Sequence, residues 1–517
     1  MSNTRDILNL SAVELRNAVA SGAVSAQQAV RAYLEAVSQR DGAVGAYVEV
    51  FAERSLERAA SIDEARAAGR AAGPLAGVPV AVADNICTEF GRTTCGSKIL
   101  AQFRSPFSAT AVAKLESAGA IVLGKAAVDE FGMGASTEPG GGGGGTPTRN
   151  PWDASRVAGG NGAAAAVAGR LAAAAIGGDT GGAVRQAAAF CGVVGVKPTY
   201  GRVSRFGLAE YGSSLEQIGP MTRDVADAAV LLSVLAGQDA NDATSVALPA
   251  ADFLAGLDQP PTGLRVGLPK EFFHQDDQAL AAGALDTEIL AALQQAVEAF
   301  KAAGATLVEV SLPHSRAGKD ARGNLYSHAV AAYGIIAMSE ASSNLARFGG
   351  MHFDRRTDQP CNDVHELYAR SRAEGFGDEV KLQVMLGTHM LTAGLYDTYY
   401  TKALQVRRLI KNDFDQAFRA QHEQRCDVLL CPTTPTPPPP FGEKIGDPLA
   451  RHSADLYTCS ANLAGLPAVA LPAGVSKTGL PIGIQLLAPA FGEDTLLRAA
   501  RMYERQVGAT RWRPAGF

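Results

Sequence analysis

Apolar residues near the start of the chain recur at intervals of three and four. This spacing runs through Leu8–Ser38 and again through Tyr47–Ala72, and it is the pattern of amphipathic helices. Ser11 is followed three residues later by Glu14, which has the form of a capping box, and Ser25 has the position of a second helix start. We therefore expect a helical layer at the N-terminus.

The pattern changes after Pro74. Short apolar runs such as GVPVAVADN, AIVLGK and GVVGVKP alternate with glycine-rich turns and alanine-rich helical stretches. Continuous apolar runs of this length are typical of strands buried on both faces, so the alternation predicts an α/β core with a largely buried sheet. Two low-complexity pieces, PGGGGGGT at Pro139–Thr146 and PTTPTPPPP at Pro432–Pro440, predict a surface loop and an extended segment.

Four stretches follow one another within what we expect to be a single domain. The helical layer occupies residues 1–72 and the alternating core occupies residues 74–236. Long helical patterns between about 255 and 420 predict a helical cap or insertion, and residues 426–517 return to the core. A length of 517 residues fits three average domains, but large α/β enzymes often build one core around one sheet.

Composition narrows the classes of function. The 47% apolar and 19% charged residues are typical of a globular protein, and a net charge of −5 supplies no basic field for strong, direct nucleic-acid binding. The most apolar stretch is mostly alanine and contains Arg170, so we expect no membrane span. The N-terminus lacks the apolar core of a secretory signal, and seven cysteines without C-x-x-C spacing predict reduced thiols in the cytoplasm. We expect no metal and no cofactor.

A glycine-rich segment is the strongest candidate for chemistry. GGDTGGAVRQAAAF, at residues 177–190, places small residues at a tight turn before a helix. Such a turn exposes backbone N–H groups in the geometry of an oxyanion hole. We therefore expect the amides of Thr180, Gly181, Gly182 and Ala183 to polarise a carbonyl oxygen.

Further segments around this turn indicate a family. GVPVAVADNICT, VLGKAAVDEFGMGASTE, PTRNPWDASRVAGG and SSLEQIGPMTRDVADAA surround it, and CDVLLCPTTPTP, DLYTCSANLAGLPAVALPAG and GLPIGIQLLAP continue the match toward the C-terminus. Together they closely resemble the amidase-signature family, and within it the A subunits of tRNA amidotransferases. The resemblance implies an α/β fold with a mixed sheet of roughly ten strands flanked by helices on both faces. It also implies a serine-based amidase mechanism and a complex with tRNA-binding and small tether subunits.

By this resemblance, the hydrolytic relay of the family falls on three positions that lack its side chains. The family lysine corresponds to Ala83, the bridging serine to Asn161, where the chain is two residues shorter, and the nucleophilic serine to Ala183. A methyl group cannot attack a carbonyl, and a carboxamide is not a useful base. Loss of one member of such a unit can cost on the order of a millionfold in rate. Asn161 on its own is a better candidate for a helix N-cap.

The implied substrate pocket departs from the family as well. Where the family uses an arginine to clamp the carboxylate of glutamine, this chain has Leu382 and Gln383, and neither supplies a guanidinium fork. The acidic partner of the substrate amine corresponds to Asp455, for which a helix-start carboxylate is an equal alternative. We interpret Lys125 and Asp129 as a buried structural ion pair.

These observations together predict a pseudoenzyme, meaning a structural, regulatory or ligand-binding protein that keeps the fold and the surface for partner subunits. One alternative is an enzyme with repurposed, non-hydrolytic chemistry, in which the turn amides act on a small amide or amino acid. The other alternative is an active amidase or the A subunit of a glutamine-dependent tRNA amidotransferase.

Overall fold

The computed structural model describes residues 4–70, 73–134, 136–138, 147–273, 285–319, 325–353, 355–419, 425–443, 453–508 and 512–517. The six-glycine segment expected to be a surface loop lies outside these residues. Within them, no helix combines the length and the apolar character that crossing a bilayer requires. No group of three or more potential metal-ligating side chains occurs within the same residues.

The N-terminal layer is helical, as the spacing of its apolar residues predicts. Ser11 and Ser25 each begin a helix with a complete capping box, which closes with Glu14 and Gln28 respectively. The layer consists of α1 (Thr4–Asn9), α2 (Ala12–Ser21), α3 (Ala26–Val44) and α4 (Ala52–Ala67).

An eleven-stranded mixed sheet forms the centre of the molecule, in the order β1-β3-β2-β6-β8-β7-β14-β15-β13-β9-β10. Its strands are β1 (Tyr47–Val50), β2 (Pro79–Ala83), β3 (Ile121–Ala126), β6 (Ala174–Asp179), β7 (Val194–Lys197), β8 (Gln217–Thr222), β9 (Arg265–Pro269), β10 (Thr306–Val310), β13 (Val428–Pro432), β14 (Ala468–Val475) and β15 (Pro481–Leu487). Strand β2 is parallel to both of its neighbours, whereas β6 pairs antiparallel with β8. The predicted α/β fold with a large mixed sheet is confirmed, with eleven strands instead of roughly ten.

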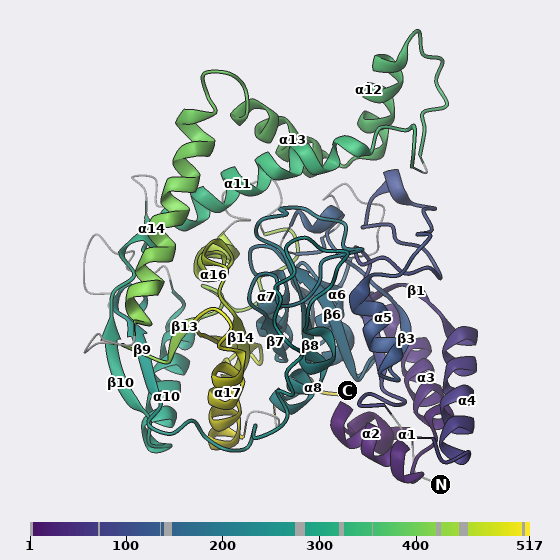
Figure 1. Cartoon of the computed structure of the whole chain (residues 1–517), viewed down its shortest axis with the longest axis vertical. Coiled ribbons are helices and arrows are strands. Elements are labelled where there is room, and N and C mark those ends of the chain that lie inside the picture. The colour runs from purple at the N-terminus through teal and green to yellow at the C-terminus, as the bar shows by residue number, and fades with distance from the viewer. Residues whose placement is uncertain are drawn as a thin grey trace.

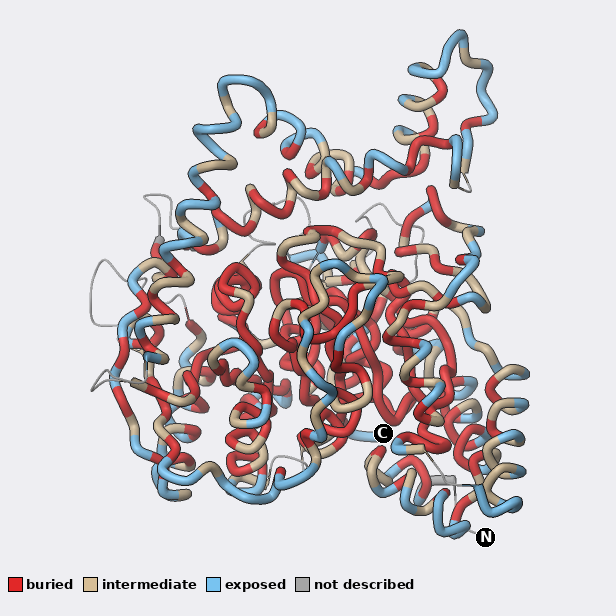
Figure 2. Tube along the Cα trace, in the orientation of Figure 1, coloured by how far each residue is buried: buried red, intermediate tan, exposed pale blue. Residues whose placement is uncertain are grey.

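Helices flank this sheet (Figure 1). They are α5 (Thr110–Ser117), α6 (Gly162–Ala168), α7 (Ala183–Cys191), α8 (Val225–Leu235), α9 (Lys270–Phe273), α10 (Thr287–Ala302), α16 (Cys459–Ala464) and α17 (Glu493–Val507). Two small ribbons, β4 (Arg149–Asn150) with β5 (Asp153–Val157) and β11 (Ala317–Lys319) with β12 (Leu325–Ser327), lie outside the main sheet. The central strands are buried almost throughout, because helices cover them (Figure 2).

A helical arm extends beyond the sheet along one edge of the molecule (Figure 1). It consists of α11 (His328–Asn344), α12 (Val364–Gly375), α13 (Asp378–Met390) and α14 (Lys402–Ala417). Much of its surface is exposed (Figure 2), whereas β9 and β10, which precede it in the sequence, are part of the main sheet.

Candidate active site

The glycine turn connects a central strand to a buried helix. Strand β6 ends at Asp179, the turn covers residues 180–182, and α7 begins at Ala183. Gly182 has φ +141°, a conformation that side-chain-bearing residues rarely adopt, and an added Cβ would lie 2.3 Å from Oγ1 of Thr458. Glycine at this position is therefore required by both the backbone and the close approach of Thr458.

The second glycine of the turn is packed against the helical arm. A Cβ at Gly181 would lie 2.5 Å from the hydroxyl oxygen of Tyr333, on α11. The Thr458 hydroxyl donates a hydrogen bond of 2.7 Å to the carbonyl oxygen of Gly181. Within the described part of the chain, the amide N–H groups of Gly181 and Gly182 donate to no acceptor. The oxyanion hole over residues 180–183 remains a prediction.

Replacing Gly181 with alanine is expected to destabilise the fold by about 1–3 kcal/mol, because the new methyl group collides with the Tyr333 ring. Urea unfolding measures this free energy. Gly334→Ala is the matched control, since a Cβ there makes only an ordinary contact of 3.9 Å with Met338. If both variants lose the same stability, the close approach of Tyr333 is not what requires glycine in the turn.

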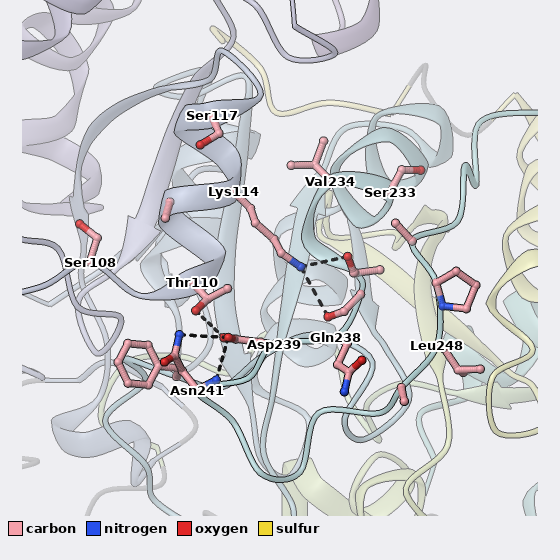
Figure 3. Close-up of a pocket in the computed structure, with 17 residues that line it drawn as sticks. Ser108, Thr110, Lys114, Ser117, Ser233, Val234, Gln238, Asp239, Asn241 and Leu248 are labelled. Carbon is pink, nitrogen blue, oxygen red and sulfur yellow. Dashed lines mark hydrogen bonds between the residues drawn. The ribbon is translucent and has the colours of Figure 1, made fainter.

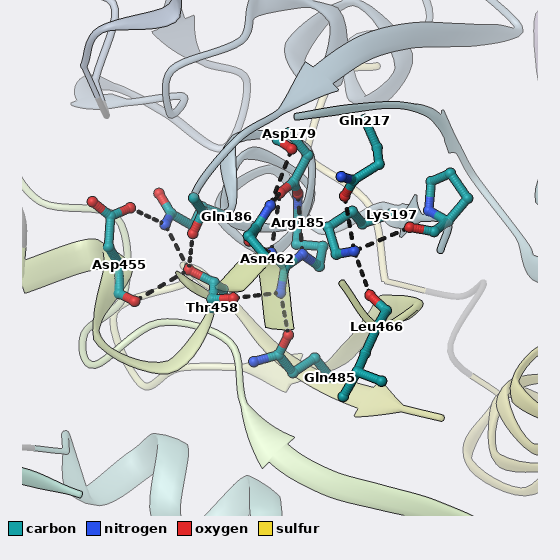
Figure 4. Close-up of polar contacts among 12 residues, drawn as sticks. Asp179, Arg185, Gln186, Lys197, Gln217, Asp455, Thr458, Asn462, Leu466 and Gln485 are labelled. Atoms are coloured by element: carbon teal, nitrogen blue, oxygen red, sulfur yellow. Dashed lines mark hydrogen bonds and ion pairs between the residues drawn. The ribbon is translucent and has the colours of Figure 1, made fainter. Parts of the chain in front are cut away.

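A fully buried ion pair holds the two ends of the turn together (Figure 4). Nε and Nη2 of Arg185 donate to the two carboxylate oxygens of Asp179, both at 3.0 Å, and both side chains have 0% exposure. Burial alone raises the pKa of the Asp179 carboxyl, but the charge and hydrogen bonds of Arg185 outweigh burial, so the pKa is lowered. The bidentate geometry fixes the start of α7 relative to the end of β6.

The same guanidinium reaches the C-terminal part of the chain. Its Nη1 donates to the carbonyl oxygen of Thr458 at 3.1 Å and to Oε1 of Gln485 at 2.9 Å, and its Nη2 donates to Oδ1 of Asn462 at 2.6 Å. Asn462 returns a bond of 2.9 Å to the Asp179 carboxylate. Every donor of this network therefore has a partner, which buried charge requires.

Hydrogen bonds through two residues, neither of which was a candidate in the sequence, connect Asp455 to the turn. Asp455 is 8% exposed and belongs to the 3₁₀ helix η6 (Ser453–Tyr457). The amide nitrogen of Gln186 donates to Oδ1 of Asp455 at 2.7 Å and to Oγ1 of Thr458 at 2.9 Å (Figure 4). Because Thr458 also donates to the carbonyl oxygen of Gly181, hydrogen bonds connect the Asp455 carboxylate to the turn through Gln186 and Thr458.

The three positions that the resemblance assigns to the family relay lie on elements around β6, and their assignment remains a prediction. Ala83 is the last residue of β2, next to β6, and is completely buried. Asn161 caps α6, since its Oδ1 accepts a hydrogen bond of 3.1 Å from the amide of Ala163, which confirms the predicted N-cap. Ala183 is the first residue of α7 and is partly exposed.

Of the two residues that the resemblance assigns to the position of the family arginine, Gln383 points inward. It is 2% exposed, and its Oε1 accepts a hydrogen bond of 2.7 Å from the Tyr211 hydroxyl. Its Nε2 donates to Oε1 of Glu379 at 2.8 Å, whereas Leu382 on the same helix is half-buried. The carboxamide of Gln383 is therefore fixed by two hydrogen-bond partners.

Two buried titratable groups near the turn had no signal in the sequence. Burial raises the pKa of Glu216 to about 8, although the Tyr211 amide donates to its carboxylate at 2.9 Å. Burial, together with the nearby charge of Arg185, lowers the pKa of Lys197 to about 7. The Lys197 ammonium donates to Oε1 of Gln217 at 3.0 Å and to two carbonyl oxygens, so its role here is to join strands β7 and β8 to the chain around residue 466.

The raised pKa of Glu216 predicts how stability changes with pH. Glu216 is protonated in the folded state up to about pH 8 but ionises near pH 4.3 when unfolded, so the unfolded state binds fewer protons between these values. Stability is therefore expected to fall as pH rises through this window, and Glu216→Gln is expected to flatten that decline. Urea unfolding from pH 4.5 to 8.5 measures it, with the exposed Glu53→Gln as control; identical slopes for wild type and Glu216→Gln would contradict the assignment.

The interpretation of Lys125 and Asp129 as an ion pair is wrong. The Lys125 ammonium lies 3.8 Å from Oδ1 of Asp84 and donates to Oγ1 of Thr93 at 2.9 Å. Asp129 instead accepts hydrogen bonds from backbone amides, of which the one from Thr137 is 2.8 Å. Lys125 lies on β3, parallel to β2, and Asp84 follows directly after β2, so sheet pairing selects the partner.

A hollow of about 840 Å³ with a mixed polar and apolar lining lies away from the turn, between α5, α8 and the segment after α8 (Figure 3). Its two charges are both satisfied internally. The Lys114 ammonium donates to the carbonyl oxygens of Leu235 and Ala236 at 3.1 and 3.0 Å, and the Asp239 carboxylate accepts from the Thr110 hydroxyl at 2.5 Å. Lys114 therefore serves as a C-terminal cap of α8.

Comparison with known proteins decides the family. The model of the Amidase family matches residues 28–497, which is most of the chain. The chain belongs to the amidase family. The A subunit of glutamyl-tRNA(Gln) amidotransferase from Moorella thermoacetica is 46% identical to this amidase-family chain over 511 residues, covering 98% of this chain and 99% of the relative.

Solved structures agree with this family. The crystal structure of the A subunit of glutamyl-tRNA(Gln) amidotransferase from Thermotoga maritima has a TM-score of 0.73 at 36% identity, covering 98% of this chain and 94% of that chain. A native peptide amidase from Stenotrophomonas maltophilia has a TM-score of 0.77 at 30% identity, covering 98% and 99%.

These findings correct the functional expectation. The prediction of a pseudoenzyme is wrong, because the relatives that match almost the whole chain at 46% identity are named as amidotransferase subunits. That prediction inferred the function of the whole protein from the side chains at three positions. The alternative of an amidase or an amidotransferase component fits the findings better.

Proposed function

We propose that this chain is the A subunit of a glutamine-dependent glutamyl-tRNA(Gln) amidotransferase. The observation that carries the proposal is the group formed by Asp455, Gln186 and Thr458, which ties a buried carboxylate to the turn at Gly181. A substrate that carries both an amine and an amide finds here a negative charge and backbone N–H donors within one rigid frame. The near full-length similarity to named A subunits supports the same assignment.

Each part of this frame has a proposed role. The carboxylate of Asp455 binds the substrate amine, and the amides of Gly181 and Gly182 polarise the carbonyl of the substrate amide. The buried Asp179–Arg185 pair does not touch the substrate; it positions the turn. The carboxylate of glutamine faces Gln383, which binds it more weakly than a guanidinium does.

We also propose that the relay of the family is replaced at Ala83, Asn161 and Ala183. The two methyl groups have no lone pair, and the carboxamide of Asn161 is neither a useful nucleophile nor a useful base, so the attacking lone pair belongs to water or to an acceptor amine. With water, a C–O bond forms at the polarised carbonyl, the C–N bond breaks, and a proton of the water ends on the leaving nitrogen. Ammonia and a carboxylic acid are the products.

Affinity for glutamine tests the roles of the pocket residues. Gln383→Arg is expected to tighten L-glutamine binding about tenfold to a hundredfold, because a guanidinium forms charge-assisted bonds with the carboxylate and Glu379 lies within reach to orient it. Asp455→Asn is expected to weaken binding by a similar factor. Isothermal titration calorimetry measures both, and Leu382→Arg serves as the matched control. Equal tightening by Leu382→Arg would show that added charge, and not the inward position, is responsible.

For the organisation of the chain, we propose that residues 1–517 work as one domain in the cytoplasm, with the helical arm as its cap. The proposed partners are tRNA-binding and small tether subunits. Co-expression followed by size-exclusion chromatography tests this assembly. We expect one complex that contains all three chains, and elution of this chain alone would contradict the proposal.

A further inference from the structure

A cavity of about 370 Å³ lies between the N-terminal layer, the end of α6 and the C-terminal segment, which are separate from the glycine turn. Three guanidinium groups line it: Arg40 from α3, Arg170 from the segment after α6, and Arg513. One acidic side chain, Glu35, is among the residues that line it. The walls thus carry an excess of positive charge gathered from three distant parts of the sequence.

Arg170 is built into this cavity by the fold. It is 9% exposed and has φ +54°, a left-handed conformation that is uncommon for a residue with a side chain. Its Nη1 donates to the carbonyl oxygen of Leu8 at 2.7 Å, which fixes the guanidinium against α1. Burial, followed by repulsion from Arg223 and other nearby arginines, lowers the pKa of Arg170 to about 10.

Arg40 adds an unsatisfied donor. Its Nη1 is shielded from solvent and has no hydrogen-bond partner within the described ranges. The guanidinium lies 5.7 Å from the centre of the Phe517 ring, which holds it against another wall of the cavity. A buried guanidinium nitrogen without an acceptor is costly in a folded protein, so the position of Arg40 beside this cavity is held at a cost in stability.

We propose that this cavity is a binding site for a small phosphate-bearing molecule, with Arg40, Arg170 and Arg513 as its anchors. Guanidinium groups match the oxygens of a phosphate, and a phosphate offers more oxygens to three such groups than a carboxylate does. The polar side chains of Asn9 and Gln39 at the same walls supply further hydrogen bonds. The site does not depend on the proposed amide chemistry.

Calorimetric titration of the full chain with inorganic phosphate, at constant ionic strength set with sodium chloride, tests the site. We expect saturable binding of one phosphate per chain. Arg40→Ala and Arg513→Ala are each expected to weaken it at least about tenfold, since each removes a charged donor. Arg70→Ala, which removes the same charge from an exposed position of the N-terminal layer, is expected to leave binding within about twofold.

Two further titrations distinguish a small phosphate-bearing molecule from the phosphate backbone of a nucleic acid. Glycerol phosphate is expected to compete with inorganic phosphate while glycerol does not, and a short single-stranded RNA is expected to bind no more tightly than phosphate itself. Three results would overturn the proposal: no saturable heat, equal weakening in Arg70→Ala and Arg513→Ala, or RNA binding that exceeds phosphate binding by tenfold or more. Because Arg513 is exposed, Arg513→Ala is expected to leave the fold intact, so its effect on binding can be interpreted even if Arg40→Ala damages the fold.

Discussion

The variant Ala83→Lys/Asn161→Ser/Ala183→Ser is expected to release ammonia from L-glutamine at least on the order of a thousandfold faster than the wild-type chain. The substitutions supply a base, a proton carrier and a nucleophile at three positions around β6, and groups of this kind act as one unit. The serine at position 183 would stand at the start of α7, directly after the turn amides. An ammonia assay on the purified complex with its partner subunits measures the rate.

Single substitutions are the controls for this experiment. Ala83→Lys alone adds a base without a nucleophile and is expected to leave the rate of ammonia release unchanged. Thermal unfolding of each variant separates a failed relay from a damaged fold. A wild-type chain that already matches the triple variant would show that the relay residues are not placed where the resemblance puts them.

Loss of the buried ion pair is expected to have the largest effect on stability. Arg185→Met leaves the carboxylate of Asp179 buried without its charge partner, and breaking a buried pair in this way costs about 3–5 kcal/mol. Urea unfolding at pH 7 measures this loss. Arg347→Met, at a position whose side-chain hydrogen bond is exposed, is the matched control and is expected to change stability by less than about 0.5 kcal/mol.

The effect of pH on this variant has a defined sign. The folded-state pKa of Asp179 is lowered, so its contribution to stability is fully present above the unfolded value near 3.9 and is lost as pH falls through the lower folded value. Without Arg185, burial raises that pKa, so acid is expected to reduce the difference between variant and wild type. The double variant Asp179→Asn/Arg185→Met is expected to recover part of the lost stability. A loss below about 1 kcal/mol in Arg185→Met would contradict the role of the pair.

The fold could be predicted from the sequence because its signals are local or continuous. Capping boxes such as Ser11 with Glu14, and the cap formed by Asn161, need only three or four neighbouring residues. Two strands of the sheet lie in the stretch that was interpreted as a helical cap. RVGLP and TLVEV, which form β9 and β10, are short runs beside long helical patterns, and only pairing with β13 and with each other makes them strands.

The site could be predicted only in part. The glycine turn is visible in the sequence because tight backbone geometry requires small residues. Asp455 was named in the sequence, but its hydrogen bond with Gln186 was not, since the two residues are 269 positions apart and only the fold brings them together. The partner of Lys125 was assigned to the wrong carboxylate for the same reason, because the parallel pairing of β2 with β3, and not sequence distance, places Asp84 beside it.

The functional error had a different origin. The chemistry of a methyl group at positions 83 and 183 is certain, but the function of a protein in a complex also depends on binding, positioning and partners. Those properties involve the whole chain, and the whole chain resembles named amidotransferase subunits. The three positions therefore raise the question of which group attacks the amide, whereas the assignment of the protein rests on the similarity of the whole chain.

Glutamine-dependent conversion of glutamyl-tRNA(Gln) to glutaminyl-tRNA(Gln) by this chain, together with the tRNA-binding and tether subunits, tests the central claim most directly. The account predicts amidated tRNA when all three chains and glutamine are present, and a loss of product on Asp455→Asn. An intact three-chain complex that forms no amidated tRNA would contradict it.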